Sequence, residues 1–107
     1  MTGLRIYLDD ERKTPENENW VRCYHVWEVI TLLEKREPIE VMSLDHDLGS
    51  GEPTGYEVIQ WLEQKVATDP TFVPPEHIIV HSANPVGKER MKAGIYQIYK
   101  MVNERNS

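Results

Sequence analysis

The sequence predicts an α/β domain in which a parallel sheet of about four strands, in the order 2-1-3-4, has helices on both faces. Short β-prone runs alternate along the chain with segments whose apolar residues recur every three or four positions. This alternation implies right-handed crossovers between parallel strands. The length of 107 residues suits one domain, spanning 1–107, with one hydrophobic core.

The first half of the chain predicts two strands and one helix. A short apolar run predicts a strand at 4–8, which stops abruptly in a charged segment. The segment 13–19 has no apolar periodicity, so we expect a loop with room for one short helical turn. A second strand is predicted at 21–25. The helix predicted at 26–36 has its valines and leucines on one face and ends before Pro38.

The second half repeats the pattern and completes the sheet. A strand is predicted at 39–44. Thr54 is a candidate N-cap for the helix that follows, whose apolar residues have the spacing of a helix packed on a sheet. The apolar run 78–80 predicts the interior of the fourth strand. The segment 86–103 is predicted to be helical, with Gly94 marking a break.

Composition and charge narrow the possible functions. The 18 acidic and 12 basic residues give a net charge of −6, which disfavours an extended nucleic-acid surface or binding to an anionic membrane. No apolar run is long enough to span a membrane. Cys23 is the only cysteine, so no internal disulfide can form, and we expect a buried structural thiol in a cytoplasmic protein.

Acidic residues follow two strands that are expected to be neighbours. Asp9 and Asp10 come after the first strand, and Asp45 and Asp47 after the third. Ligands of such folds bind at the carboxyl ends of the strands, where the order reverses. Like charges about 4 Å apart cost roughly 4 kcal/mol in a partly buried site. A divalent cation, Mg²⁺ or Mn²⁺, would relieve this repulsion. Protonation of one carboxyl group would relieve it as well. The simpler interpretation is that the two acidic segments are unrelated solvated turns and form no site.

Other polar residues at the same edge are candidates for chemistry. His46 is a candidate metal ligand, a general acid or base, or a hydrogen-bonded loop residue. One of His81 and Ser82 is expected to point into the pocket and contact an oxyanion, while His81 could equally pack on the other face. The amide of Asn84 could bind phosphate or stabilise a turn. Lys88 could reach a phosphate or be solvated on a helix.

Three common motifs of phosphate-binding sites and hydrolases are absent. The glycine-rich segment 49–51 lacks the Lys-Ser/Thr of a P-loop and does not match a dinucleotide fingerprint. Ser82 does not stand in the G-x-S-x-G context of an α/β-hydrolase nucleophile. The acidic edge is therefore the main candidate site.

Several of these residues together resemble a response-regulator receiver domain. The shared residues are Asp9-Asp10, Asp45, Gly55 and Ser82-Ala83. The resemblance implies a flavodoxin-like three-layer sandwich, with Asp9 and Asp10 as metal-binding acids, Asp45 as the phospho-acceptor position and Ser82 as a hydroxyl that contacts the phosphoryl group. The chain departs from receivers in lacking the first helix, a fifth strand and the Lys-Pro that carries the receiver lysine.

A closer resemblance rests on two longer segments, Leu44-Asp45-His46-Asp47-Leu48 and His81-Ser82-Ala83-Asn84-Pro85. They are similar to the receiver-derived family of cyclic-phosphate-processing receiver domains. This implies a metal-dependent phosphoesterase acting on a small cyclic phosphate or an RNA end, with Asp45, His46, His81 and Ser82 as catalytic candidates. The alternatives are an inactive pseudo-receiver that binds an ion, nucleotide or protein, and, less well supported, an HD-type phosphohydrolase based on His46-Asp47.

Overall fold

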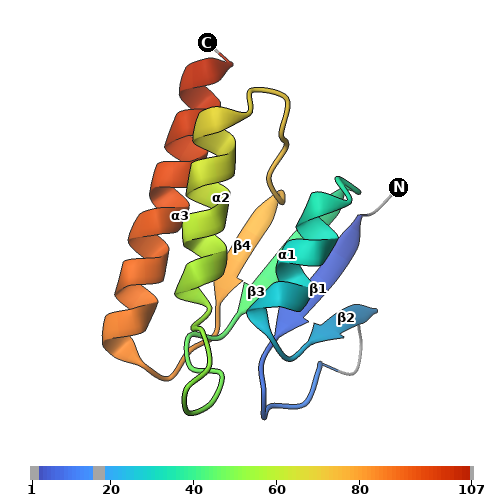
Figure 1. Ribbon diagram of the computed structural model, residues 1–107, viewed down its shortest axis with the longest axis vertical. Helices are drawn as coiled ribbons and strands as arrows, with labels where there is room; N and C mark the ends of the chain where they lie inside the picture. The colour runs from blue at the N-terminus through green and yellow to red at the C-terminus, as the bar shows by residue number, and fades with distance from the viewer. Residues whose placement is uncertain (1–2, 16–18, 107) are drawn as a thin grey trace.

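Four parallel strands and three helices form the domain in the computed structural model, which describes residues 3–15 and 19–106. The predicted sheet order 2-1-3-4 is confirmed, with all strands parallel (Figure 1). The helical turn considered for the loop 13–19 falls partly outside the described residues. In chain order the elements are β1 (Leu4–Leu8), β2 (Trp20–Cys23), α1 (Val26–Glu34), β3 (Ile39–Leu44), α2 (Tyr56–Thr68), β4 (His77–Val80) and α3 (Pro85–Arg105).

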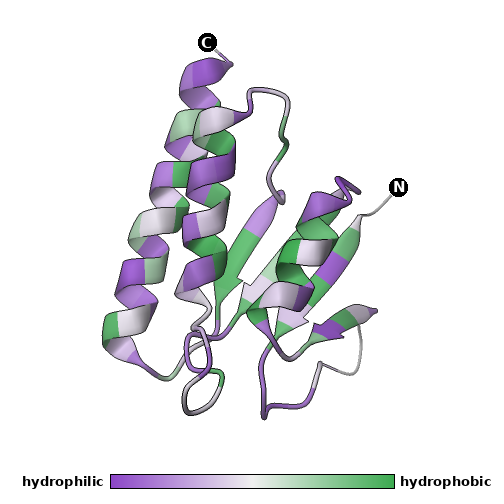
Figure 2. Cartoon of the chain, in the orientation of Figure 1, coloured by the Kyte–Doolittle hydropathy of each residue, from purple (hydrophilic) through white to green (hydrophobic). Residues whose placement is uncertain are grey.

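The hydrophobic core lies between one face of the sheet and all three helices. Ile6 pairs in register with Met42, and Leu8 with Leu44, so these four side chains share one face. All four are fully buried in one cluster with apolar residues of α1, α2 and α3. In Figure 2 the strands β1, β3 and β4 carry hydrophobic segments, whereas the loop after β1 is hydrophilic.

This placement of the helices differs from the expectation of helices on both faces. The crossovers from β2 to β3 and from β3 to β4 run in the same direction across the sheet. Right-handed crossovers in one direction place their helices on the same face. The connection from β1 to β2 runs the other way, and its described residues contain no helix. The opposite face is lined instead by a polar and aromatic group that includes Arg5, Tyr7 and Ser43.

Three local predictions are corrected by the backbone. The strand predicted at 21–25 spans 20–23, because His25 is the N-cap of α1. Helix α2 has Gly55 as its N-cap, so the hydroxyl of Thr54 does not cap it. Gly94 does not break α3: a Cβ at this position would lie 2.3 Å from Cγ2 of Ile59, so the glycine allows α2 and α3 to pack closely.

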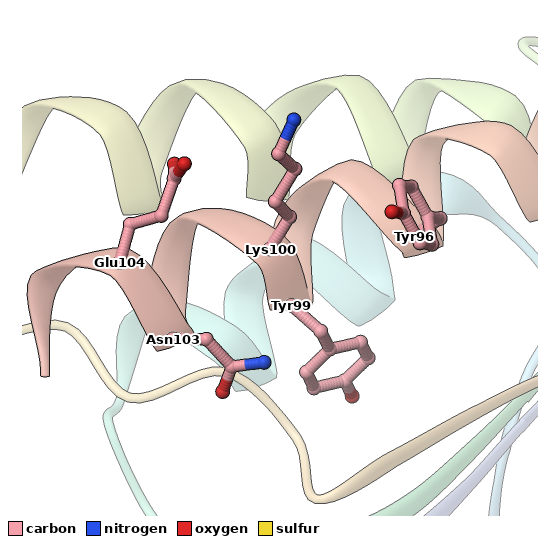
Figure 3. Close-up of a pocket in the computed structure, with 5 residues that line it drawn as sticks. All are labelled: Tyr96, Tyr99, Lys100, Asn103 and Glu104. Carbon is pink, nitrogen blue, oxygen red and sulfur yellow. The ribbon is translucent and has the colours of Figure 1, made fainter. Parts of the chain in front are cut away.

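The helices of the described chain are too short or too polar to cross a membrane. The longest, α3, also carries a groove, which is lined by Tyr96, Tyr99, Lys100, Asn103 and Glu104 (Figure 3). Because α3 begins just after the carboxyl end of β4 and runs back along the sheet, this groove lies toward the amino ends of the strands. It is therefore remote from the acidic strand ends.

Candidate functional site

The acidic residues that follow β1 and β3 converge because these strands are neighbours in register. Leu8 pairs with Leu44, and the backbone N–H of Asp45 donates to the carbonyl of Leu8 at 2.9 Å. Asp9, Asp10 and Asp45 each offer a carboxylate oxygen, and these oxygens lie within 4.8 Å of one another. Hard divalent cations prefer such oxygen donors. The structure thus brings together three of the four predicted metal ligands.

A pocket of about 350 Å³ opens at this acidic cluster. Asp47, the fourth predicted ligand, lines the pocket but does not belong to the group of three converging carboxylates. The pocket is therefore wider than the cluster, with room for a ligand beside an ion. Its lining consists of Asp9, Asp10, Glu11, Arg12, Asp45, Asp47, Gly49 and Ala83.

Asp9 is the most constrained carboxylate of the pocket. Its side chain is 1% exposed, and one oxygen accepts the backbone N–H groups of Glu11 and Arg12 at 2.8 and 3.0 Å. The other oxygen lies 2.9 Å from Nε2 of His81. Burial raises the pKa of Asp9, but these hydrogen bonds outweigh it and hold the pKa below its ordinary value. Asp9 is therefore a preorganised, ionised oxygen donor.

Asp45 has the opposite electrostatic character. Burial and then the nearby charge of Asp9 raise its pKa, although its carboxylate accepts the backbone N–H of His46 at 2.8 Å and a hydrogen bond from Ser82. The raised pKa means that a second negative charge is unfavourable here. A bound cation would remove this cost. A cation in the pocket would therefore favour the ionised form of Asp45.

His81 supports Asp9 from the side of the sheet that carries no helix. Its Nε2 contacts Asp9, its Nδ1 lies 2.6 Å from the hydroxyl of Ser43, and its ring stacks on Tyr7 at 4.5 Å. Because an ionised carboxylate only accepts, Nε2–H donates to Asp9 and the Ser43 hydroxyl donates to Nδ1. Burial lowers the pKa of His81, so the ring favours its neutral form. Both ring nitrogens are therefore engaged within the protein.

His46 is not among the residues that line the pocket. Its Nδ1 donates to Asp47 at 2.8 Å, and its ring fills the space beside Gly87, where a Cβ would come within 2.5 Å of ring atoms. Asn84 is the N-cap of α3: its side-chain oxygen accepts the N–H of Gly87 at 3.0 Å, and its amide lies 3.4 Å from Asp47. These contacts fix the loop after β3 against the start of α3.

The structure separates the two remaining phosphate-binding candidates. Ser82 is nearly buried and bonds to Asp45, and its hydroxyl also accepts the N–H of Asn84 at 3.1 Å. Lys88 lies in a different groove, between α3 and β4, together with Ile78, Val80 and Ile95. Lys88 therefore lies outside the pocket lining, whereas Ser82 adjoins the acidic cluster.

Two residues of the site were not identified from the sequence. Arg12 lines the pocket, but in the sequence it is one of several charged residues after a strand. The hydroxyl of Ser43 is hydrogen-bonded to His81. In the sequence, Ser43 is marked only as a polar residue between Met42 and Leu44 in an apolar strand. Because strand side chains alternate, Ser43 and His81 are both on the face opposite to Met42, a pairing that the sequence could have suggested.

Comparison with known families gives one match that covers most of the chain. The family model described as the cyclic-phosphate processing receiver domain matches residues 4–97. This range contains all four strands, α1, α2 and every residue of the pocket lining. Comparisons with curated proteins and with solved structures find no match.

Proposed function

Because the chain belongs to the cyclic-phosphate processing receiver domain family, we propose that it is a metal-dependent phosphoesterase that opens cyclic phosphates, including those at RNA ends. The observation that best supports this is the convergence of Asp9, Asp10 and Asp45 within 4.8 Å beside a pocket. The substrate is a small cyclic phosphate or a chain end, because a net charge of −6 disfavours an extended nucleic-acid surface. A cytoplasmic location forms part of the proposal, in keeping with the single buried thiol, Cys23.

The donor set of the pocket fits Mg²⁺ or Mn²⁺. Three carboxylate oxygens converge, and burial together with the charge of Asp9 raises the pKa of Asp45, so a cation beside these oxygens would be favourable. Asp9, Asp10 and Asp45 would hold the ion. When bound, such an ion supplies charge stabilisation at a phosphoryl oxygen. Mg²⁺ suits this role because it uses few carboxylates, retains waters and accepts phosphate oxygens.

Asp45 is the proposed general base. In hydrolysis a water oxygen bonds to phosphorus while one bond between phosphorus and a ribose oxygen breaks. Asp45 lines the pocket, so a carboxylate oxygen that does not hold the ion can take the proton of the attacking water. The departing oxygen takes a proton from solvent, and the product is a phosphate monoester. His81 acts as a positioning residue, because both of its ring nitrogens hold other side chains.

A turnover assay tests this proposal directly. The full chain is incubated with a nucleoside 2′,3′-cyclic phosphate and Mg²⁺ or Mn²⁺, and monoester products are separated by chromatography. We expect metal-dependent formation of a monoester that stops when EDTA is added. Absence of product with either metal, in protein that melts cooperatively, would contradict the enzymatic proposal.

One observation favours a second candidate function. Both predicted catalytic histidines are hydrogen-bonded to aspartates and neither lines the pocket. A domain that binds an ion and a phosphate group without turnover needs no mobile proton donor. In that case, metal and beryllofluoride would bind at the acidic cluster, while cyclic phosphates would remain intact.

The pKa shift of Asp45 gives a pH-dependent prediction. The folded state binds the Asp45 proton more tightly than the unfolded state, whose ordinary value is 3.8. Stability from this group is therefore present at low pH and is lost as pH rises through the raised pKa. Without metal, we expect Asp45→Asn to gain stability relative to the natural protein across this window.

The stabilisation of the protein by Mg²⁺ should also depend on pH, in the opposite direction. Because the ion competes with the proton, the increase in Tm caused by Mg²⁺ should grow as pH rises through the same window. Thermal melts of both proteins, with and without metal, measure these two differences. A metal effect that is independent of pH would contradict the assignment of Asp45 as a ligand.

A further inference from the structure

We propose that Arg12 is the phosphate-binding cation of the acidic pocket, an inference that deepens the proposed function and rests on it. Its ligand class is a phosphate mono- or diester anion. Among the residues that line the pocket, Arg12 is the only one with a positively charged side chain. Lys88, the basic residue that the sequence suggested for this role, lies in another groove.

The backbone and side chain of Arg12 are both held at the pocket. Its N–H donates to Asp9 at 3.0 Å and closes the turn that follows β1. Its Nη1 donates to the carbonyl of His81 at 3.0 Å, just after β4. The side chain therefore reaches from the end of β1 to the end of β4. It holds the guanidinium at the carbonyl of His81, while Arg12 and Ala83 both line the pocket.

Most N–H donors of the Arg12 guanidinium have no hydrogen-bond partner among the described residues. A guanidinium has five N–H donors. Within residues 3–15 and 19–106, the guanidinium of Arg12 makes one hydrogen bond, which goes to the carbonyl of His81. In the same part of the chain it forms no ion pair with a carboxylate, although it lines an acidic pocket. The side chain is also exposed. Its planar donors can therefore engage two oxygens of an incoming phosphate.

The charge of the pocket explains why such a cation is needed. The three carboxylates of Asp9, Asp10 and Asp45 exceed the two positive charges of one divalent ion. Asp47 and Glu11 add further negative charge to the lining. A phosphate anion entering this field is repelled unless a cation faces it. Arg12 meets this requirement from within the chain, so the site does not need a lysine from a partner.

Calorimetric titration of inorganic phosphate into the Mg²⁺-loaded full chain tests this assignment. We expect Arg12→Gln to weaken phosphate binding by about tenfold or more, the loss typical of a charge-assisted hydrogen bond. Arg12→Lys should recover part of the affinity, because it keeps the charge but not the paired donors. Lys13→Gln is the matched control: it removes the same charge from the next residue, which does not line the pocket, and should bind as the natural protein does.

The outcomes separate this inference from the proposed function. Phosphate binding that depends on Arg12, in a protein without turnover of cyclic phosphates, supports the phosphate site and removes the enzymatic function. Turnover by the natural protein with equal phosphate affinity in Arg12→Gln overturns the phosphate site alone. Absence of phosphate binding to the Mg²⁺-loaded natural protein also overturns it. Mg²⁺ affinity, measured in parallel, should be unchanged or higher in Arg12→Gln, which shows that the pocket is folded.

Discussion

Asp45→Asn should abolish cyclic-phosphate turnover, with a loss of about 10²–10⁴-fold, while the metal-free protein becomes more stable. The activity is lost because the variant lacks the proposed base, whose positioning typically contributes this factor. Stability rises because the substitution removes a charge that burial and Asp9 make unfavourable. The asparagine oxygen can still accept the N–H of His46, so the local backbone is retained.

Turnover and melting measured on the same preparations test this pair of effects. Glu11→Gln is a useful control, because Glu11 lines the pocket but is not one of the three converging carboxylates. It should change metal affinity only slightly. If Asp45→Asn retained most of its activity, or melted at a lower temperature than the natural protein without metal, the assigned role of Asp45 would be wrong.

Gly55→Ala should destabilise the protein by about 2 kcal/mol and weaken metal binding at the same time. A Cβ at Gly55 would lie 1.9 Å from the carbonyl oxygen of Asp45, a backbone atom that cannot rotate away. Either α2 or the end of β3 must then shift, and overpacking of this kind costs about 1–3 kcal/mol. Because Asp45 is displaced, its carboxylate should leave the cluster.

Chemical denaturation and Mg²⁺ titration measure the two consequences. Thr54→Ala provides the neighbouring control: its hydroxyl caps no helix, so we expect a change of less than about 0.5 kcal/mol. A Gly55→Ala protein with unchanged stability and metal affinity would show that the close approach of α2 to Asp45 is not structurally required.

The sequence predicted the sheet well because strand periodicity and topology constrain each other. The apolar runs at 4–8 and 39–44 are strands with those same bounds, and the order 2-1-3-4 follows from their connections. That order makes β1 and β3 neighbours, so the convergence of Asp9 and Asp45 followed from it. This part of the site depends on the backbone alone.

Two of the errors concern contacts that only the folded chain defines. Gly94 signals a helix break when considered alone, but its role is set by Ile59 on another helix. The identity of the pocket's cation is a further example. Lys88 and Arg12 are both near strand ends in the sequence, and the direction of each side chain decides that only Arg12 lines the pocket. Sequence spacing does not specify that direction.

Crystals of the full chain grown with Mn²⁺, with the anomalous signal of manganese recorded, test the central claim most directly. The metal site predicts one strong anomalous peak at coordination distance from carboxylate oxygens of Asp9, Asp10 and Asp45. The same crystals of Asp45→Asn should show a weaker peak or none. A peak elsewhere on the molecule, or none at this cluster under millimolar manganese, would contradict the claim that these carboxylates form a metal site.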